Sequence, residues 1–377
     1  MAEQHEKALV PQIRFTGFTD PWEQRKLGEV AHFINGRAYS QNELLSSGKY
    51  PVLRVGNFYT NDSWYYSNLE LEDKNYAYEG DLLYTWSATF GPHIWHGNKV
   101  IYHYHIWKVQ LEAAFEKLFA FQLLERDKER ILSDKNGSTM VHITKIGIEN
   151  TSVLMPCSVI EQRQIGAFFD RLDSLITLHQ RKYDKLCVLK KSMLDKMFPK
   201  GGSLYPEIRF AGFTNHWEQR KLGEVAHFIN GRAYSQNELL SSGKYPVLRV
   251  GNFYTNDSWY YSNLELEDKN YAYEGDLLYT WSATFGPHIW HGNKVIYHYH
   301  IWKVQLEAAF EKLFAFQLLE RDKERILSDK NGSTMVHITK IGIENTSVLM
   351  PCSVIEQRQI GAFFDRLDSL ITLHQRK

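Results

Sequence analysis

The segment Ile160-Glu-Gln-Arg-Gln-Ile-Gly-Ala-Phe-Phe-Asp-Arg-Leu-Asp-Ser-Leu-Ile176 sets the architecture of this chain. Its apolar residues fall alternately four and three positions apart, and charged residues lie between them. The same stripe continues to Met193 and is interrupted by His179 and Lys190. That spacing is typical of a coiled-coil helix, and it predicts one long helix over residues 160–198.

The segment occurs twice, because Ile355–Ile371 repeats it residue for residue. Working outward, residues 22–182 are identical to residues 217–377. Each copy is long enough to form a domain with its own core. We therefore expect a first globular domain over residues 1–157, a spacer helix over 158–200, a second domain over 201–352, and a shorter spacer helix over 353–377.

Each globular domain should mix strands with helices. Segments rich in β-branched and aromatic residues predict strands at Pro51–Asn57, Gly80–Trp86 and Lys99–Val109. Amphipathic spacing predicts a helix over Phe115–Leu132. The expected fold class is α+β, with two mixed α/β domains related by a pseudo-twofold axis and joined by long antiparallel coiled-coil helices.

The junction between domain and spacer helix carries a helix-start signal. Ser158 is a plausible N-cap residue, and Glu161 stands three positions later at capping-box spacing. Tyr183, Leu186 and Met193 belong to the part of the first spacer helix that the second copy lacks. We therefore expect them to be left without a partner in the chain and to bind another protein.

Bulk composition limits the class of protein. Lys and Arg together number 44, as do Asp and Glu, so the formal net charge is zero. A neutral chain argues mildly against DNA binding, although charge can gather on one face or come from a partner subunit. The three cysteines form no CxxC pair, and the start of the chain lacks an apolar leader. We expect a cytoplasmic protein.

Catalytic motifs are missing from the sequence. It contains no phosphate-binding GxxxxGK[ST] loop and no GxSxG elbow. His103-Tyr104-His105 would place two imidazoles on one face of a strand, as a metal site needs. No cysteine or carboxylate stands at ligand spacing, so a polar strand face is the favoured interpretation. We predict no enzyme activity, no metal and no cofactor.

Polar loops supply the candidate recognition residues, since Arg, Gln, Asn, Ser and His can read base edges or hold phosphates. Turn chemistry alone also explains such residues, and for any single one it is the favoured explanation. The candidates in the first copy are Arg37, Tyr39, Ser40, Gln41, Asn57, Tyr59, Ser87, Thr89, His93, Lys135, Asn136, Ser138, Thr139 and His142. Their copies are Arg232, Tyr234, Ser235, Gln236, Asn252, Tyr254, Ser282, Thr284, His288, Lys330, Asn331, Ser333, Thr334 and His337.

Several motifs resemble those of the DNA-specificity (S) subunits of type I restriction–modification systems. Phe18-Thr-Asp-Pro-Trp-Glu-Gln-Arg-Lys-Leu-Gly-Glu-Val30 is similar to the opening of a target-recognition domain in that family. Glu79-Gly-Asp-Leu-Leu83 is similar to a strand entry, and Gly137-Ser-Thr-Met-Val-His-Ile-Thr144 begins an exit that continues through the segment quoted first. These motifs recur in the second copy.

The resemblance implies a non-catalytic subunit with two target-recognition domains that binds double-stranded DNA. It also implies two modification (methyltransferase) subunits as partners and, in larger complexes, two restriction subunits. Members of the family usually carry two different domains, whereas these two are identical, so we expect a bipartite inverted-repeat target. Two other interpretations stay open: a protein-bridging scaffold that uses the paired helices, and a fused methyltransferase or nuclease with an unrecognised site.

Overall fold

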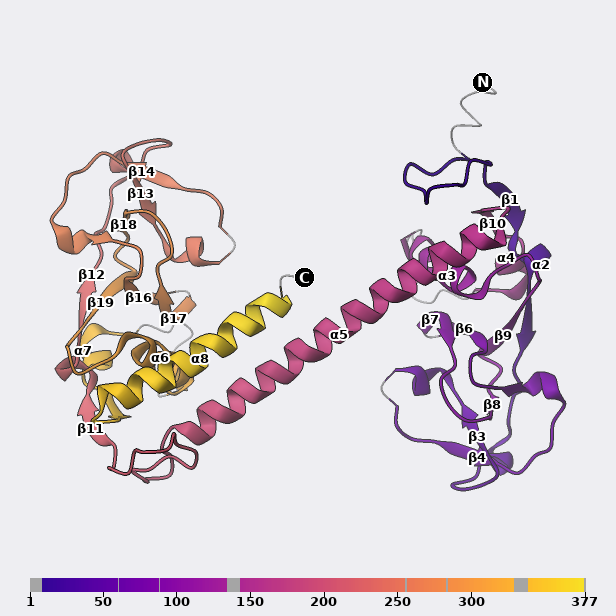
Figure 1. Ribbon diagram of the computed structural model, residues 1–377, viewed down its shortest axis with the longest axis horizontal. Helices are drawn as coiled ribbons and strands as arrows, with labels where there is room; N and C mark the ends of the chain where they lie inside the picture. The colour runs from indigo at the N-terminus through magenta and orange to yellow at the C-terminus, as the bar shows by residue number, and fades with distance from the viewer. Residues whose placement is uncertain are drawn as a thin grey trace. The chain divides into compact units, whose positions relative to one another are not determined.

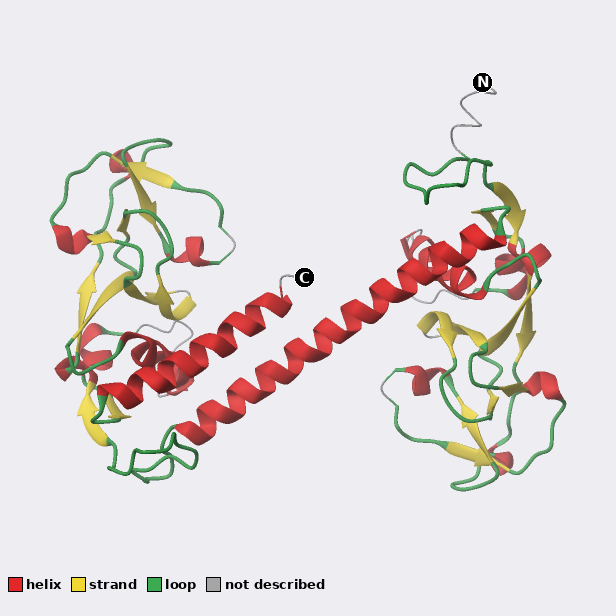
Figure 2. Ribbon diagram, in the orientation of Figure 1, coloured by secondary structure: helices red, strands yellow, loops and turns green. Residues whose placement is uncertain are grey.

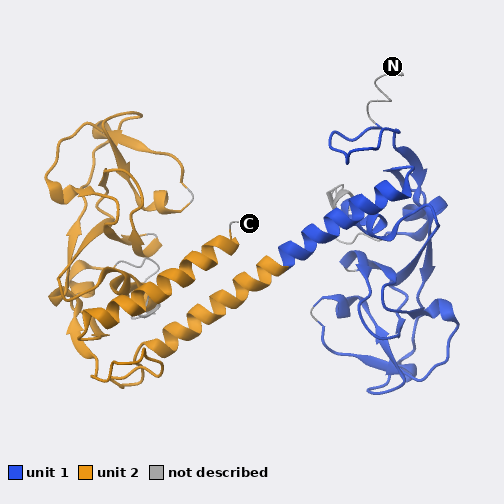
Figure 3. Ribbon diagram, viewed as in Figure 1, with its two compact units in different colours: residues 1–177 blue, residues 178–377 orange. Residues whose placement is uncertain are grey.

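A computed structural model describes residues 9–59, 61–87, 89–133, 143–254, 256–282, 284–328 and 338–375. The chain divides into two compact units, residues 1–177 (unit 1) and residues 178–377 (unit 2), which are coloured separately in Figure 3. Each unit contains one copy of the repeat, and the long helix α5 (Val159–Met197) contributes to both. No helix in the described ranges combines the length and hydropathy that a membrane crossing requires.

Three sheets form unit 1 (Figures 1 and 2). One four-stranded sheet has the order β2-β9-β6-β7, another has the order β4-β3-β8-β5, and β1 pairs with β10. The strands are β1 (Glu23–Lys26), β2 (Ala31–Asn35), β3 (Tyr50–Leu53), β4 (Tyr65–Ser67), β5 (Tyr76–Ala77), β6 (Leu82–Ser87), β7 (Thr89–Ile94), β8 (Val100–Tyr102), β9 (Ile106–Leu111) and β10 (Ser152–Met155). The helices are α2 (Leu27–Val30), α3 (Lys117–Ser133), α4 (Lys145–Glu149) and the first part of α5.

Unit 2 repeats this topology, with sheet orders β12-β19-β16-β17, β14-β13-β18-β15 and β11-β20. Its strands are β11 (Glu218–Lys221), β12 (Ala226–Asn230), β13 (Tyr245–Leu248), β14 (Tyr260–Ser262), β15 (Tyr271–Ala272), β16 (Leu277–Ser282), β17 (Thr284–Ile289), β18 (Val295–Tyr297), β19 (Ile301–Leu306) and β20 (Ser347–Met350). Its helices are α6 (Lys312–Ser328), α7 (Lys340–Glu344) and α8 (Val354–Gln375), with the second part of α5.

The main core of unit 1 lies between the β2-β9-β6-β7 sheet and helix α3. Alternating residues of β6, such as Leu82 and Tyr84, face this core, whereas Leu83 faces a second, smaller core on the other side. Phe119 and Leu123 of α3 close the main core from the helix side. The period-2 alternation of the strand therefore serves two cores at once.

The predicted strand over residues 99–109 is wrong in one respect. It is broken into β8 and β9 by a tight turn at His103–His105, closed by the Ile106 amide donating to the His103 carbonyl at 2.9 Å. The strand is broken because its two halves belong to different sheets. β8 pairs with β3 and β5, whereas β9 pairs with β2 and β6 in the other sheet. The two histidines therefore lie in a turn between sheets, not on one face of a strand.

Helix α5 begins as predicted, but the capping box is only half formed. The Glu161 amide donates to Ser158 Oγ at 3.4 Å, as an N-cap requires. The buried Glu161 carboxylate instead accepts two hydrogen bonds from Arg14, at 2.7 and 2.8 Å, and one from Trp22 Nε1 at 3.2 Å. This bidentate pair fastens residues near the start of the chain to the spacer helix.

In unit 2 the second part of α5 runs antiparallel beside α8 (Figure 1). His179 Nδ1 lies 2.9 Å from His374 Nδ1, and Lys190 pairs with Asp368. The two interruptions of the apolar stripe are thus filled by polar pairs. Leu186 and Met193 pack against the unit 2 core, so the expectation that they lack a mate within the chain is wrong. The reason is that antiparallel pairing around His179 sets the second part of α5 against α8.

Gly166 lets α5 approach α3 closely. A Cβ atom at this position would lie 2.5 Å from the Phe119 amide nitrogen and 2.7 Å from the Leu118 carbonyl carbon. Both neighbours are backbone atoms of α3, so the helices would have to separate. We expect Gly166→Ala to lower the free energy of unfolding of unit 1 by about 1–3 kcal/mol, measured by chemical denaturation. Ala167→Ser, at an exposed neighbour, is the control and should change it by less than about 0.5 kcal/mol.

Candidate nucleic-acid interface

The β8–β9 turn gathers several of the predicted recognition residues in unit 1. Arg37 forms an isolated bridge with His103, and its amide donates to the Tyr102 carbonyl at 3.2 Å. The Tyr39 ring stacks with the His103 ring at a centroid separation of 6.5 Å. The Arg37 guanidinium lies 5.1 Å from the centre of the Tyr39 ring, within cation–π range. Arg37 and Tyr39 are therefore held beside the turn, not on a free loop.

Glu43 organises the same loop. Arg37 Nη2 donates to the Glu43 carboxylate at 2.6 Å, and the Ser40 amide and hydroxyl donate to its other oxygen at 2.8 and 3.0 Å. The hydrogen bond from Arg37, followed by those from Ser40, lowers the pKa of Glu43 to about 2. The ion pair therefore stabilises the loop fully at pH values above the ordinary carboxyl pKa. This stabilisation is lost as the pH falls toward 2 and Glu43 becomes protonated. Gln41 begins the short 3-10 helix η1 (Gln41–Glu43) in this loop.

The tip of the β6–β7 hairpin reaches the same turn. Trp86 Nε1 donates to the Tyr104 carbonyl at 2.8 Å, and the Trp86 ring packs edge-on against His105 at 5.1 Å. Ser87 and Thr89 face each other across the hairpin immediately beyond Trp86. The hairpin tip and the β8–β9 turn thus form one aromatic and polar surface, on which Tyr104 is exposed.

A second cluster surrounds His93 of β7. Its ring stacks on Phe58 at 4.0 Å, and its Nε2 lies 3.3 Å from Thr85 Oγ1 and 3.4 Å from the Tyr59 hydroxyl. Burial, with a smaller contribution from the charge of Lys128, lowers the pKa of His93 to about 4. The ring is therefore neutral at pH 7 and contributes stability that is lost as the pH falls from 6.5 toward 4. Exposed Tyr59 is the accessible member of this cluster.

Asn57 organises the loop that follows β3. Its Oδ1 accepts from the Arg54 amide, and its Nδ2 donates to the carbonyls of Asn61 and Ser63, each at 3.0 Å. The Arg54 guanidinium lies 4.3 Å from the centre of the Tyr65 ring. Asn57 therefore uses its amide to hold the loop, and this loop presents Tyr59.

Among the described residues of unit 1, three buried polar atoms near the turn lack a hydrogen-bond partner: Arg37 Nη1, Tyr39 Oη and Arg54 Nε. Native proteins leave few such groups unpaired. Unit 2 repeats the set at Arg232, Tyr234 and Arg249. Polar groups with unused hydrogen-bonding capacity thus lie buried beside each turn.

The structure brings two groups of predicted residues together, one around His103 and one around His93. It places Arg37, Tyr39, Ser87 and Thr89 in or beside the first group and Tyr59 in the second. The equivalent contacts recur in unit 2, for example Arg232 with Glu238 and Tyr254 with His288. Ten candidates lie outside the described residues: Lys135, Asn136, Ser138, Thr139, His142, Lys330, Asn331, Ser333, Thr334 and His337.

Sequence reasoning missed Arg54, Trp86 and Tyr104 as members of this surface. Arg54 lay inside the predicted strand Pro51–Asn57, but the observed strand β3 ends at Leu53, the residue before Arg54. The adjacent aromatic and imidazole groups of His103–His105 were the available signal, but they were interpreted as part of a strand. In the ranges that the structure describes, no group of three or more His, Cys, Asp or Glu side chains is arranged to hold a metal ion.

Comparison with known proteins gives a consistent result over both repeats. Residues 19–187 and 214–377 match the family described as type I restriction modification DNA specificity domain. The chain is 26% identical over 231 residues to the type I restriction enzyme MjaVIII specificity subunit of Methanocaldococcus jannaschii. That alignment covers 59% of this chain and 53% of the relative, so the chain spans about half the length of the relative.

The fold is also similar to that of a solved structure. The crystal structure of a type-I restriction-modification system S subunit from M. genitalium superposes with a TM-score of 0.59 at 16% sequence identity. The superposition covers 97% of this chain and 94% of that chain. At this level of identity the similarity concerns the fold alone, with its paired α/β domains and long helices.

Proposed function

Because this chain belongs to the type I restriction–modification DNA specificity family, we propose that it recognises a bipartite DNA target and positions modification subunits on it. Members of this family are the DNA-specificity subunits of type I restriction–modification systems, and these subunits are not catalytic. Restriction subunits would join the same complex. The proposed ligand is double-stranded DNA, read by the surface around His103 and His93 in unit 1 and by its copy in unit 2.

One observation carries the proposal: the family match extends over both copies of an identical repeat. Two identical reading surfaces must each meet the same bases. If the two surfaces meet DNA around a twofold axis, the target is an inverted repeat with two equal half-sites. Exposed Tyr59 and Tyr104, with nearby arginines, supply the stacking and hydrogen-bonding groups that DNA interfaces use.

The decisive experiment maps the modified bases in cells that carry this chain together with its modification subunits. We expect methylation at an inverted repeat, with one methyl group in each half on opposite strands. The assembled complex should also retain a matching duplex in a salt-dependent binding assay. A mapped target with two unrelated half-sites would refute the symmetric target, and binding without sequence preference would refute the proposal itself.

Arg37 is the residue of this surface that we expect to matter most for recognition. Arg37→Ala combined with Arg232→Ala should weaken binding to the target. If each arginine contacts a base, we expect a loss of about 1–3 kcal/mol per half-site, confined to one base position. If each contacts phosphate, the loss should be uniform across sequences and the salt dependence should decrease. Duplex titration at several salt concentrations measures both.

The Glu43→Gln and Glu238→Gln pair is the matched control. It removes the ion pair of each arginine but leaves the guanidinium in place. If Arg37 acts on DNA, the glutamine pair should retain target binding. Equal losses in the two double variants would show that the arginines only hold the loop.

A further inference from the structure

The end of α5 fills a cavity in unit 2. The Phe198 ring packs on Trp217 at 5.6 Å, on Phe314 at 5.6 Å and on Phe364 at 6.2 Å. The Arg321 guanidinium lies 4.9 Å from the centre of the Phe198 ring, and its Nη2 donates to the Pro199 carbonyl at 3.3 Å. Phe198 is thus enclosed by aromatic rings and capped by an arginine.

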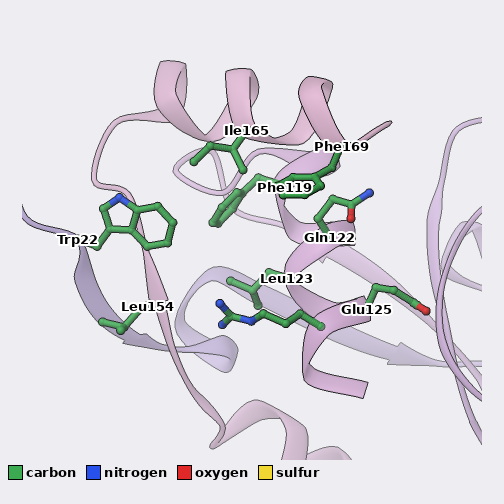
Figure 4. A pocket seen from close by; sticks show the side chains of 9 residues that line it. Trp22, Phe119, Gln122, Leu123, Glu125, Leu154, Ile165 and Phe169 are labelled. Carbon is green, nitrogen blue, oxygen red and sulfur yellow. The ribbon is translucent and has the colours of Figure 1, made fainter. Parts of the chain in front are cut away.

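The equivalent place in unit 1 is an open cavity of about 360 Å³. Figure 4 shows its lining side chains, which come from α3, α5, the strand β10 and Trp22, the residue immediately before β1. They include Trp22, Phe119 and Phe169, which are the copies of the three rings around Phe198. Arg126, the copy of Arg321, lies at the same cavity.

The side chains around this site are much less exposed in unit 2, where the cavity is filled, than in unit 1. Phe169 is 43% exposed, whereas its copy Phe364 is fully buried. Leu172 is 37% exposed, against 7% for Leu367. The sequences are identical, so what covers the surface accounts for the difference. In unit 2 the cover includes Leu186 and Met193 of α5 and Phe198, the residue that follows the helix.

The polar rim is also conserved between the copies. Asp368 accepts from Gln317 at 2.9 Å and pairs with Lys190 of α5. Its copy, Asp173, accepts from Gln122 at 2.8 Å. Asp173 of unit 1 therefore occupies the position at which Asp368 of unit 2 pairs with Lys190 of α5. An occupant with a lysine at that place would meet a matching charge.

We infer that the cavity of unit 1 is a docking site for an amphipathic helix end with the chemistry of residues 183–199. The occupant places a phenylalanine between Trp22 and Phe119, covers Phe169 and Leu172, and brings a lysine to Asp173. The seated helix end in unit 2 shows that this surface accepts such a segment, and that segment buries a full aromatic side chain there. The site is distinct from the proposed DNA surface, so its test does not depend on DNA binding.

The test adds a labelled synthetic peptide of residues 183–199, with Cys187 replaced by serine, to the full chain. Fluorescence anisotropy should show saturable binding of one peptide per chain, because the cavity of unit 2 is already filled. The same peptide with Phe198→Ala should bind roughly tenfold more weakly or worse, as expected for a central aromatic anchor.

Two neighbouring phenylalanines of the chain provide a matched pair. Phe169 lines the cavity, whereas Phe168 lies outside the lining and packs on Phe15 and on the edge of Phe169. Both side chains are exposed, so neither substitution should threaten the fold. Phe169→Ala should weaken peptide binding by roughly tenfold, and Phe168→Ala by less than about twofold. Absence of saturable binding, or binding that Phe169→Ala leaves unchanged, would overturn the inference. A dimer of the chain that blocks the peptide would overturn it in favour of a second copy as the occupant.

Discussion

Inserting one base pair between the two half-sites of the target is expected to reduce binding to the non-specific level, a loss of roughly a thousandfold or more. The insertion rotates one half-site by about 35° relative to the other, at roughly 10–10.5 base pairs per turn. Helix α5 is continuous from Val159 to Met197, and a continuous helix holds its ends at a fixed separation along its axis. Because this one helix joins the two units, we expect the complex not to follow the rotated half-site. Titration of duplexes with spacers of different length measures the effect.

The control changes the spacer sequence without changing its length. Such duplexes should bind the assembled complex as tightly as the original, because no reading surface is proposed to contact the spacer. Tight binding to targets with several spacer lengths would show that the two reading surfaces move independently.

Phe198→Ala is expected to lower the free energy of unfolding of unit 2 by about 3–5 kcal/mol. The residue is fully enclosed by Trp217, Phe314 and Phe364, so its removal would leave a cavity lined by aromatic rings. The loss should appear as an earlier transition in chemical denaturation, assigned to unit 2 by amide hydrogen exchange.

Phe169→Ala, in unit 1, is the comparison for this experiment. Its side chain is exposed in the absence of an occupant, so it should change stability by less than about 1 kcal/mol. Similar losses in the two variants would mean that Phe198 is no more important to the core than an exposed ring.

The helices were predictable from the sequence because their apolar spacing is long and regular. Helix α3 begins two residues after the predicted start at Phe115, α5 begins one residue before the predicted residue 160, and α8 begins one residue after the predicted residue 353. The predicted end at residue 198 lies one residue beyond the observed end of α5 at Met197. Long periodic segments carry many independent signals, which is why their positions can be read before the structure is known.

The strand predictions failed where two sheets compete for one segment. Residues 99–109 have uniform β propensity, so nothing local marks the turn at His103–His105. The turn exists because β8 and β9 pair with different neighbours, which is a non-local fact. Similarly, Glu161 stands at capping-box spacing, but Arg14, far away in the sequence, offers its carboxylate a stronger charged partner.

The unpaired apolar surface was predicted on the wrong half of α5. The sequence comparison indicated that residues 183–198 lack a copy, and from this we expected them to lack a partner. Antiparallel pairing reverses the conclusion, since residues without a copy pack against α8, while Phe169 and Leu172 are exposed. The antiparallel direction was predicted correctly, and the error lay in the register: the His179–His374 contact places the residues that follow His179 along α8.

The candidate site was predictable in its residue types but not in its partners. Arg37, Tyr39 and Tyr59 were chosen because polar and aromatic loops suit DNA. The structure adds that Glu43 holds Arg37 and that His93 supports Tyr59. Such pairings arise from tertiary contacts between loops, so the sequence alone could not reveal which side chains are held in place.

The contact between His179 and His374 has a consequence for the symmetry of the repeat. These residues are copies of one another, and their Nδ1 atoms lie 2.9 Å apart. A hydrogen bond between two such atoms requires one ring to carry the proton on Nδ1 and the other to present a lone pair. At this contact one copy therefore acts as the donor and the other as the acceptor, although the two residues are identical in sequence. The two repeats, identical in sequence, thus play opposite parts in this hydrogen bond.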